Sequence, residues 1–341
     1  MTDRGHFSPA LLEIDCEAET EAISGAIREA LAKSLHKRGL VVGISGGVDS
    51  GVTAALCARA VGPDKVVGLL MPERHSAEDT PGLSELVADR LRIRKVVVDI
   101  SPVLEAVGYY DKYDEAVRAA VPGYGRGWRS KIVASEIAEG KAYTLFSIVA
   151  AAPDGKVVKE RLGLEAYLAI VALTSFKQRI RKMLEYYHAD LHNYAVAGTS
   201  NRLEYDQGFF VKQGDGAADI KPIAHLYKTQ VYDLARHLGL PEAIVNRLPT
   251  ADTYSLPQGH DEFYFGVPCG IMDLCLYGKN NGFSPEEVAP AAGLSAGRVE
   301  AVYRDIDRKR VAGRYLHLPP LLVRDVPEAG PDVKAGKGPA G

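Results

Sequence analysis

The first residues that indicate chemistry form one hexapeptide, Ser45-Gly46-Gly47-Val48-Asp49-Ser50. It joins an apolar run over residues 40–44, which predicts a β-strand, to an Ala-rich stretch that predicts a helix over residues 48–60. Glycines at such a turn let backbone amides face one concavity, and the helix N-terminus adds partial positive charge. The hexapeptide therefore predicts a site for an anion that carries several phosphate oxygens.

The acidic residue in this loop indicates that the phosphate binds together with a cation. The loop is not a Walker P-loop, because no Gly-Lys-Ser/Thr sequence closes it and Asp49 occupies the turn instead. A carboxylate beside a phosphate implies a cation between them, and Mg²⁺ prefers carboxylate and phosphate oxygens. Asp49 is thus a candidate Mg²⁺ ligand. The alternative interpretation is a plain strand-to-helix turn that Asp49 caps.

The elements that must position this loop alternate along the chain. Strands alternating with helices predict an α/β fold with a doubly wound parallel sheet that is covered on both faces. Such sheets bind ligands at the carboxyl ends of their strands, which is where the hexapeptide lies. The further strands are expected at residues 65–71, 95–99 and 194–198, and the helices at 18–37, 84–91, 176–190 and 228–238.

A middle segment departs from this alternation. Residues from about 101 to 164 interrupt the α/β pattern, and two alternating runs about Pro153-Asp154-Gly155 predict a β-hairpin there. We interpret the segment as an insertion that is a lid, a partner surface or a substrate selector. Its Arg126, Trp128 and Arg129 suit an anionic or aromatic guest.

The C-terminal part of the sequence lacks the alternation of strands and helices. Residues from about 284 to 310 predict C-terminal helices, since Ser284-Pro285-Glu286-Glu287 is a capping signature. Residues 326–341 are Pro, Gly, Lys and Ala for the most part, and we expect a disordered tail. We therefore expect one domain over residues 1–325.

Composition excludes several classes of protein. The 341 residues are 46% hydrophobic and 25% charged, as in an ordinary globular chain, and the net charge of −3 makes broad nucleic-acid binding unlikely. No apolar run is long enough to span a bilayer, and the N-terminus lacks signal-peptide features, so we expect a cytoplasmic protein without a membrane partner. The four cysteines have no zinc or disulfide spacing.

A second glycine-rich block allows a family to be suggested. The hexapeptide resembles the pyrophosphate-binding loop of the N-type ATP pyrophosphatases. Residues 198–219 include Gly198-Thr199, Glu204, Gly208-Phe209 and Lys212-Gln213-Gly214-Asp215-Gly216-Ala217-Ala218-Asp219, which resemble the signature of the NAD synthases. The resemblance implies an adenine nucleotide alpha hydrolase-like, Rossmann-like fold. It also implies that nicotinic acid adenine dinucleotide is amidated to NAD with ATP, releasing AMP and pyrophosphate.

The resemblance assigns expected roles to single residues. The expected Mg²⁺ ligands are Asp49 and Glu204, each of which closely follows a predicted strand, and the expected catalytic residues are Asp49, Lys228 and Arg179. The expected ATP-binding residues are Ser45, Gly46, Gly47, Val48, Asp49, Ser50, Met71, Arg179, Thr199, Lys228 and Thr250. The expected residues for the acid substrate are Ser175, Phe209, Lys212, Asp215 and Asp219. Taken singly, these charged residues also fit solvated turns and helix starts.

Departures from the family pattern keep a second hypothesis open. Ser175 stands where the family has asparagine, and Cys269 stands where a tyrosine is common. The runner-up is therefore an ATP-dependent amide synthetase on the same scaffold that acts on another carboxylic acid.

The nitrogen source and the partners are further expectations. Residue 2 is Thr and only 39 residues precede the first predicted strand, so a glutaminase domain has no place there and free ammonia or a separate amidotransferase is expected. The resemblance also suggests a homodimer. A non-enzymatic alternative is a helix-turn-helix in the C-terminal helices, with Arg304, Arg308, Lys309 and Arg310 on DNA phosphates.

Overall fold

The main sheet of the computed structural model has four parallel strands, and the model describes residues 6–77, 79–134, 146–247, 254–256, 259, 264–324 and 326. The strand order is β3-β2-β1-β7, and all three neighbouring pairs are parallel. The bounds are β1 (Leu40–Gly43), β2 (Val66–Leu70), β3 (Arg94–Val97) and β7 (Ala195–Ala197). The expectation of a parallel α/β sheet is confirmed, and each strand lies within a few residues of its predicted place.

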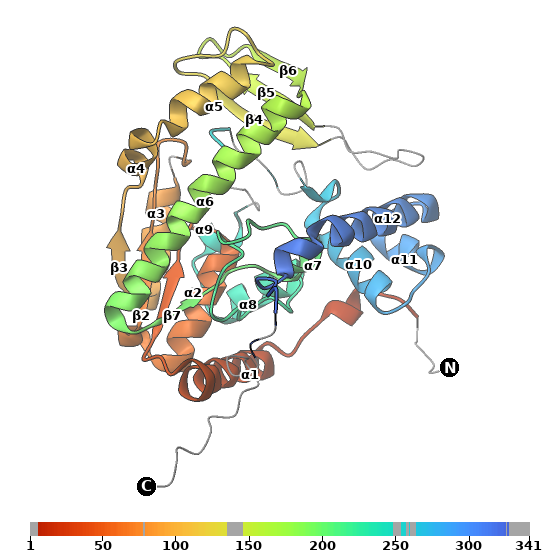
Figure 1. Cartoon of the computed structure of the whole chain (residues 1–341). Coiled ribbons are helices and arrows are strands. Elements are labelled where there is room, and N and C mark those ends of the chain that lie inside the picture. The colour runs from red at the N-terminus through yellow and green to blue at the C-terminus, as the bar shows by residue number, and fades with distance from the viewer. Residues whose placement is uncertain are drawn as a thin grey trace.

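Helices cover both faces of this sheet (Figure 1). One layer contains α1, α2, α3 and α8, and the other contains α4, α5 and the long α6. The bounds are α1 (Cys16–Glu29), α2 (Val48–Val61), α3 (Thr80–Leu91), α4 (Ser101–Ala106), α5 (Tyr109–Arg118), α6 (Leu164–His192) and α8 (Lys228–His237). Shorter elements are η1 (Pro9–Leu12), the π-helical turn η2 (Ala30–Leu35), η3 (Pro63–Lys65), α7 (Arg202–Gln207) and α9 (Glu242–Val245).

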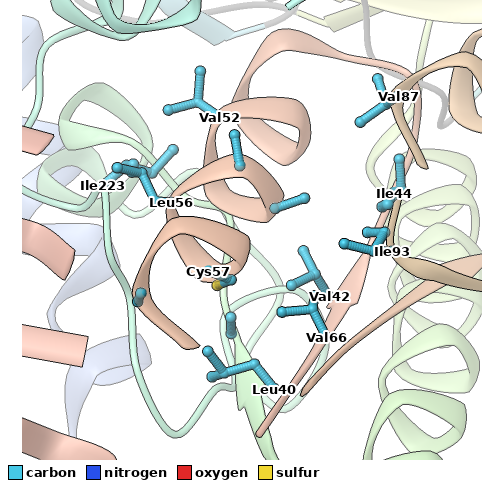
Figure 2. Packing of buried hydrophobic residues seen from close by; sticks show 14 of the residues in the cluster. Leu40, Val42, Ile44, Val52, Leu56, Cys57, Val66, Val87, Ile93 and Ile223 are labelled. Atoms are coloured by element: carbon cyan, nitrogen blue, oxygen red, sulfur yellow. The ribbon is translucent and has the colours of Figure 1, made fainter. Parts of the chain in front are cut away.

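The strand β1 shows why both faces are buried. Its residues Leu40 and Val42 pack into the cluster that includes α2, whereas Val41 between them packs into the cluster on the α6 side. Figure 2 shows the first cluster, in which Leu40 lies toward Cys57 of α2, with Val52 and Leu56 further along the helix. Because successive side chains of a strand point to opposite faces, an apolar run without alternation fits a strand that is covered on both sides.

The middle segment forms a second, smaller sheet. Its strands β4 (Arg129–Ala134), β5 (Phe146–Ala151) and β6 (Val157–Arg161) are antiparallel in this order. The turn between β5 and β6 contains Gly155 with φ +87°, so the predicted hairpin is confirmed. The helix α6 begins at Leu164 rather than near 176, because its first three turns are apolar on several sides and pack against this sheet as well as against α5.

The C-terminal helices form a third layer with their own core. They are α10 (Cys269–Asn280), α11 (Pro285–Ala292) and α12 (Ala296–Gly313), followed by the turn η5 (Arg314–His317). The basic residues of α12 have acidic neighbours, and Arg304 lies 4.0 Å from Glu300. Arg308 and Lys309 contact Asp305, and Arg310 donates to Asp206 at 2.6 Å, so this region lacks the free basic stripe that the DNA-binding alternative requires.

The expectations of a disordered tail and of a protein without membrane spans can be compared with the described residues only. Of the predicted tail 326–341, only Val326 lies inside them, so the prediction of disorder is not addressed. Among the helices that the structure describes, none is long and apolar enough to cross a membrane.

A glycine before β1 gives a test of this packing. A Cβ at Gly39 would lie 2.3 Å from the Lys65 carbonyl oxygen and 2.6 Å from the Tyr194 ring. Because a backbone atom cannot move aside cheaply, Gly39→Ala is expected to lower the free energy of unfolding by about 1–3 kcal/mol in urea titrations. Gly82→Ala in α3 is the control, since a Cβ there meets nothing within 4 Å. An equal effect of the two substitutions would contradict this account.

Candidate active site

The loop between β1 and α2 is held by its own hydroxyl groups. Ser50 Oγ donates to the Gly47 carbonyl at 2.9 Å, and the Ser45 amide donates to Ser50 Oγ at 3.2 Å. Gly46 has φ +73°, a conformation that favours glycine, and a Cβ there would also lie 2.8 Å from Leu83. No side chain caps α2, since Gly47 is its N-cap residue, so the amides of the first turn are available to an anion.

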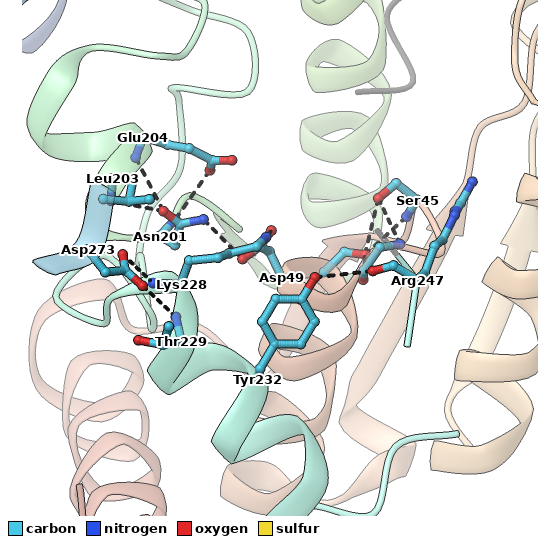
Figure 3. Close-up of polar contacts among 12 residues, drawn as sticks. Ser45, Asp49, Asn201, Leu203, Glu204, Lys228, Thr229, Tyr232, Arg247 and Asp273 are labelled. Carbon is cyan, nitrogen blue, oxygen red and sulfur yellow. Dashed lines mark hydrogen bonds and ion pairs between the residues drawn. The ribbon is translucent and has the colours of Figure 1, made fainter. Parts of the chain in front are cut away.

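A buried lysine lies beside this loop. Lys228, the first residue of α8, forms an ion pair with Asp49 in the first turn of α2 (Figure 3). Asp273 in α10 fixes the start of α8, because it accepts from the Lys228 amide at 3.1 Å and from the Thr229 amide at 2.7 Å. Burial by itself lowers the pKa of Lys228, but the nearby charges of Asp49 and Glu204 outweigh it and raise the pKa. Lys228 therefore remains a cation.

The second expected metal carboxylate, Glu204, belongs to the capping box of α7. Asn201 accepts from the Glu204 amide at 3.2 Å, and its own amide donates to Glu204 Oε2 at 3.3 Å. The Asn201 side chain also donates to Asp49 Oδ1 at 3.1 Å, so it links the two carboxylates (Figure 3). Loss of solvation raises the pKa of Glu204 and the charge of Asp49 raises it further, against the effect of Lys228.

Asp49 and Glu204 could bind a divalent cation only if a bound substrate or water supplied the remaining coordinating oxygens. The repulsion between two neighbouring carboxylates is relieved by a cation between them. Within the described residues no group of three or more His, Cys, Asp or Glu side chains could hold a metal by itself. Mg²⁺ commonly takes one or two carboxylates and completes its shell with phosphate oxygens and water. Asp49 and Glu204 match that requirement.

The loop after β2 is fixed by a buried ion pair. Lys177 Nζ of α6 lies 2.7 Å from Glu73 Oε1, and both side chains are fully buried. The other oxygen of Glu73 accepts from the Tyr110 hydroxyl at 3.0 Å and from the His75 amide at 2.9 Å. Burial alone would raise the pKa of Glu73, but Lys177 and His75 lower it to about 2. This cluster joins the segment that contains Met71 to α5 and α6.

One cavity of about 1720 Å³ brings most of the predicted residues together. It lies at the carboxyl ends of β1, β2 and β3, because Gly43, Leu70 and Val97 line it. The predicted residues that line it are Ser45, Gly47, Val48, Asp49, Ser50, Met71, Ser175, Arg179, Thr199, Glu204, Phe209, Lys212, Asp215 and Lys228. Gly46 lies in the same loop without lining the cavity.

Asp219 and Lys212 have polar contacts within the protein, and Thr250 cannot be compared. Asp219 does not line the cavity, because its carboxylate accepts from the Val196 amide of β7 at 2.7 Å and from the Tyr186 hydroxyl at 3.3 Å. Thr250 lies outside the described residues. Lys212 lines the cavity, but its Nζ donates to the carbonyls of Tyr315 at 2.7 Å and Leu318 at 2.8 Å. The expected roles of all the predicted site residues stay predictions.

Phe209 and Arg179, both predicted to contact a substrate, have neighbours within the protein. Phe209 stacks on Tyr264 with ring centroids 4.5 Å apart, so one of its faces is covered by the protein. Arg179 lies close by, and its Nε donates to the Lys212 carbonyl at 3.2 Å. Sequence reasoning did not place Glu73, Asn201 or Arg247 in the site. Their partners are distant in the sequence, so no local pattern marks them.

Fold and site together define a nucleotide-binding α/β protein with an anion-binding turn after its first strand and two carboxylates opposite a lysine. The family model for NAD synthase matches residues 19–123 and 137–311. The chain therefore belongs to the NAD synthase family. Most of the segment 101–164 lies within the matched residues, and the unmatched stretch 124–136 contains β4.

Individual relatives agree with the family. The chain is 54% identical to the NH(3)-dependent NAD(+) synthetase of Mesorhizobium japonicum over 275 residues, which cover 81% of this chain and 86% of the relative. The structure of NMN synthetase from Francisella tularensis has a TM-score of 0.62 at 21% identity and covers 91% of this chain and 99% of that one. The NH3-dependent NAD synthetase from Campylobacter jejuni has a TM-score of 0.59 at 22% identity and covers 91% and 100%. These two structures share the fold.

The Glu73–Lys177 pair gives a prediction with a defined pH dependence. Lys177→Met leaves the Glu73 carboxylate buried without its cation and is expected to lower the free energy of unfolding by about 3–5 kcal/mol at pH 7. The pKa of Glu73 is about 2 in the folded state against an ordinary 4.5, so its stabilisation is present above pH 4.5 and is lost as the pH falls toward 2.

The difference between wild type and Lys177→Met should therefore shrink on acidification. Urea titrations between pH 7 and pH 3 measure it. Lys159→Met on β6 serves as the control, because Lys159 is exposed there. A difference that stays constant down to pH 3 would show that charge pairing is not its cause.

Proposed function

We propose that this chain amidates nicotinic acid adenine dinucleotide to NAD, using ATP and ammonia and releasing AMP and pyrophosphate. The observation that carries the proposal is the grouping of the turn amides, Asp49, Glu204 and buried Lys228 at one end of a cavity large enough for two nucleotides. Membership of the NAD synthase family supports the reaction, and relatives named for ammonia-dependent synthesis support the nitrogen source.

The chemistry requires an activated acid. A carboxylate does not condense with ammonia in water, because its oxygen is a poor leaving group. An oxygen of the substrate carboxylate attacks the α-phosphorus of ATP, the bond from that phosphorus to the bridging oxygen breaks, and pyrophosphate leaves. The nitrogen of ammonia then attacks the acyl carbon of the adenylate, AMP leaves with the bonding electrons, and the nitrogen loses a proton. No protein nucleophile is needed.

The protein's contribution is position and charge. The amides at the start of α2 and the cation of Lys228 face the place where pyrophosphate gains negative charge, and such preorganised donors stabilise the transition state. Asp49 and Glu204 would hold Mg²⁺, which neutralises phosphate charge when bound. Arg179 and Met71 line the same cavity and would contact the nucleotide. Catalysis then depends on holding two substrates in line.

The acid substrate and the assembly are part of the same proposal. Ser175, Phe209, Lys212 and Asp215 line the cavity and would contact the acid, and Asp219, which accepts from the Val196 amide of β7, would support them. In the cell, the protein would act in the cytoplasm as a homodimer, with ammonia free or delivered by a separate amidotransferase.

The reaction is tested directly with purified protein. With ATP, Mg²⁺ and ammonium chloride, nicotinic acid adenine dinucleotide should yield NAD together with AMP and pyrophosphate in equal amounts, whereas glutamine should not replace ammonium. Chromatography of the nucleotides measures all products. Release of ADP and orthophosphate would contradict the mechanism. Pyrophosphate release only with another carboxylic acid would favour an amide synthetase of different specificity.

The role of Asp49 gives a second test. Asp49→Asn keeps the shape of the side chain but removes its charge, so kcat is expected to fall about 10²–10³-fold as cation binding and the ion pair with Lys228 are weakened. Asp64→Asn, at an exposed position in η3, is the control and should leave kcat within about twofold. Steady-state kinetics at several Mg²⁺ concentrations measures the effect. Wild-type kcat in Asp49→Asn would remove the residue from the mechanism.

A further inference from the structure

A second cation, Arg247, lies beside the loop between β1 and α2. It follows α9, lines the cavity and keeps 19% of its side chain exposed. Its Nη1 donates to the Gly46 carbonyl at 3.4 Å, and a Cβ on Gly46 would lie 3.4 Å from the same nitrogen. The guanidinium group therefore contacts the phosphate-binding loop, although 201 residues separate Arg247 from Gly46 in the sequence.

The place of Arg247 is fixed through its backbone. The Tyr232 hydroxyl of α8 donates to the Arg247 carbonyl at 3.1 Å. The ring of the same tyrosine faces Lys228, whose Nζ is 5.7 Å from the ring centroid. Figure 3 shows Tyr232 between the two cations, with Lys228 directed toward Asp49 and Arg247 beside Ser45. One aromatic side chain of α8 thus holds both cations at the loop before any ligand binds, which lowers the entropy cost of binding.

The acidic partner of Arg247 is weakly held. Arg247 Nη2 lies 3.1 Å from Asp79 Oδ1, and 60% of the Asp79 side chain is exposed. Asp79 is the N-cap residue of α3, but its side chain does not cap the helix. An ion pair with so exposed a partner contributes little to stability, because water screens it. Asp79 also lines the cavity, so a phosphate that reaches Arg247 there can take its place.

The leaving pyrophosphate needs more positive charge than Lys228 supplies. Lys228 is already paired with Asp49, and one ammonium group does not balance the several negative charges of the outer phosphates. Charge grows on pyrophosphate as its bond to the α-phosphorus breaks, and fixed donors aimed at that charge lower the barrier. A guanidinium group offers two parallel N–H donors that match two phosphate oxygens. Arg247 presents such a group at the Gly46 side of the loop.

We infer that Arg247 is a further catalytic residue, which exchanges Asp79 for an outer phosphate of ATP and binds pyrophosphate as it leaves. Asp79 is then a positioning residue, since it holds the guanidinium group before ATP binds and takes it back as pyrophosphate departs. Arg247 donates hydrogen bonds and transfers no proton, so the balance of the reaction is unchanged. The inference rests on the proposed function, because it adds a residue to the first step of that reaction.

Binding of inorganic pyrophosphate tests the two residues with opposite expected signs. In titration calorimetry with MgCl₂, Arg247→Ala should raise the Kd of pyrophosphate about 10–100-fold, as expected for the loss of charge-assisted hydrogen bonds. Asp79→Asn keeps the shape of the side chain and should lower this Kd about two- to fivefold, because the competing charge is removed. If Arg247 only anchored the loop, both substitutions would break the same ion pair and raise the Kd. An unchanged Kd in Arg247→Ala, or an unchanged or raised Kd in Asp79→Asn, would overturn the inference.

Matched controls use a second ligand and a second ion pair. AMP lacks the outer phosphates, so its Kd should stay within about twofold in both variants, and an equal loss of affinity for AMP and pyrophosphate would overturn the inference. Arg236→Ala and Asp233→Asn break an exposed pair of α8 that does not line the cavity, and the Kd of pyrophosphate should stay within about twofold. Arg247→Lys should recover part of the affinity that Arg247→Ala loses, since charge returns without the bidentate geometry.

Kinetics separates this inference from the proposed function. Arg247→Ala should lower kcat for NAD formation about 10–100-fold and leave KM for the acid within about twofold. A wild-type protein that makes no NAD contradicts the proposed function, whereas its affinity for pyrophosphate still tests Arg247. An active wild type whose Arg247→Ala variant keeps both kcat and the Kd of pyrophosphate overturns the role of Arg247 alone.

Discussion

The charge of Lys228 is what allows Asp49 and Glu204 to lie close together away from bulk water. Burial and the charge of Asp49 raise the pKa of Glu204, and the ammonium group of Lys228 opposes that rise. The lysine is buried at the start of α8, where Asp273 accepts from the first amides of the helix. The position of one ammonium group therefore depends on the packing of α2, α7, α8 and α10 against one another.

Many elements of the fold therefore contribute residues to one edge of the parallel sheet. The residues that meet there come from distant parts of the chain, since Lys228 and Asp49 are 179 residues apart and Lys177 and Glu73 are 104 apart. The helix α6 joins the two ends of the cavity, because a single face of it reaches from the small antiparallel sheet to the end of β1.

The sequence was sufficient for the strands and for the turn after β1, because apolar runs bounded by glycines have few other interpretations. It also predicted which residues share the cavity, since signature spacing and strand ends agree on one edge of the sheet. It did not predict the first three turns of α6, where apolar residues lie on several sides of the helix and leave no stripe to detect. Nor did it identify Asn201 or Glu73 as organising residues, because their partners become neighbours only through tertiary packing.

The contact of Lys212 with the turn η5 has a consequence for how the substrate specificity of the enzyme can change. The ammonium group of this residue donates to the carbonyls of Tyr315 and Leu318, and a Cβ added at Gly208 would lie 3.1 Å from Gly313 Cα. The glycine-rich segment is therefore shaped from behind by the last helical turn. A longer or differently folded turn would move the glycine-rich segment and so change the shape of the region expected to bind the acid substrate. The residues expected to bind ATP would stay the same. Specificity could therefore be changed, in evolution or by design, at positions outside the cavity.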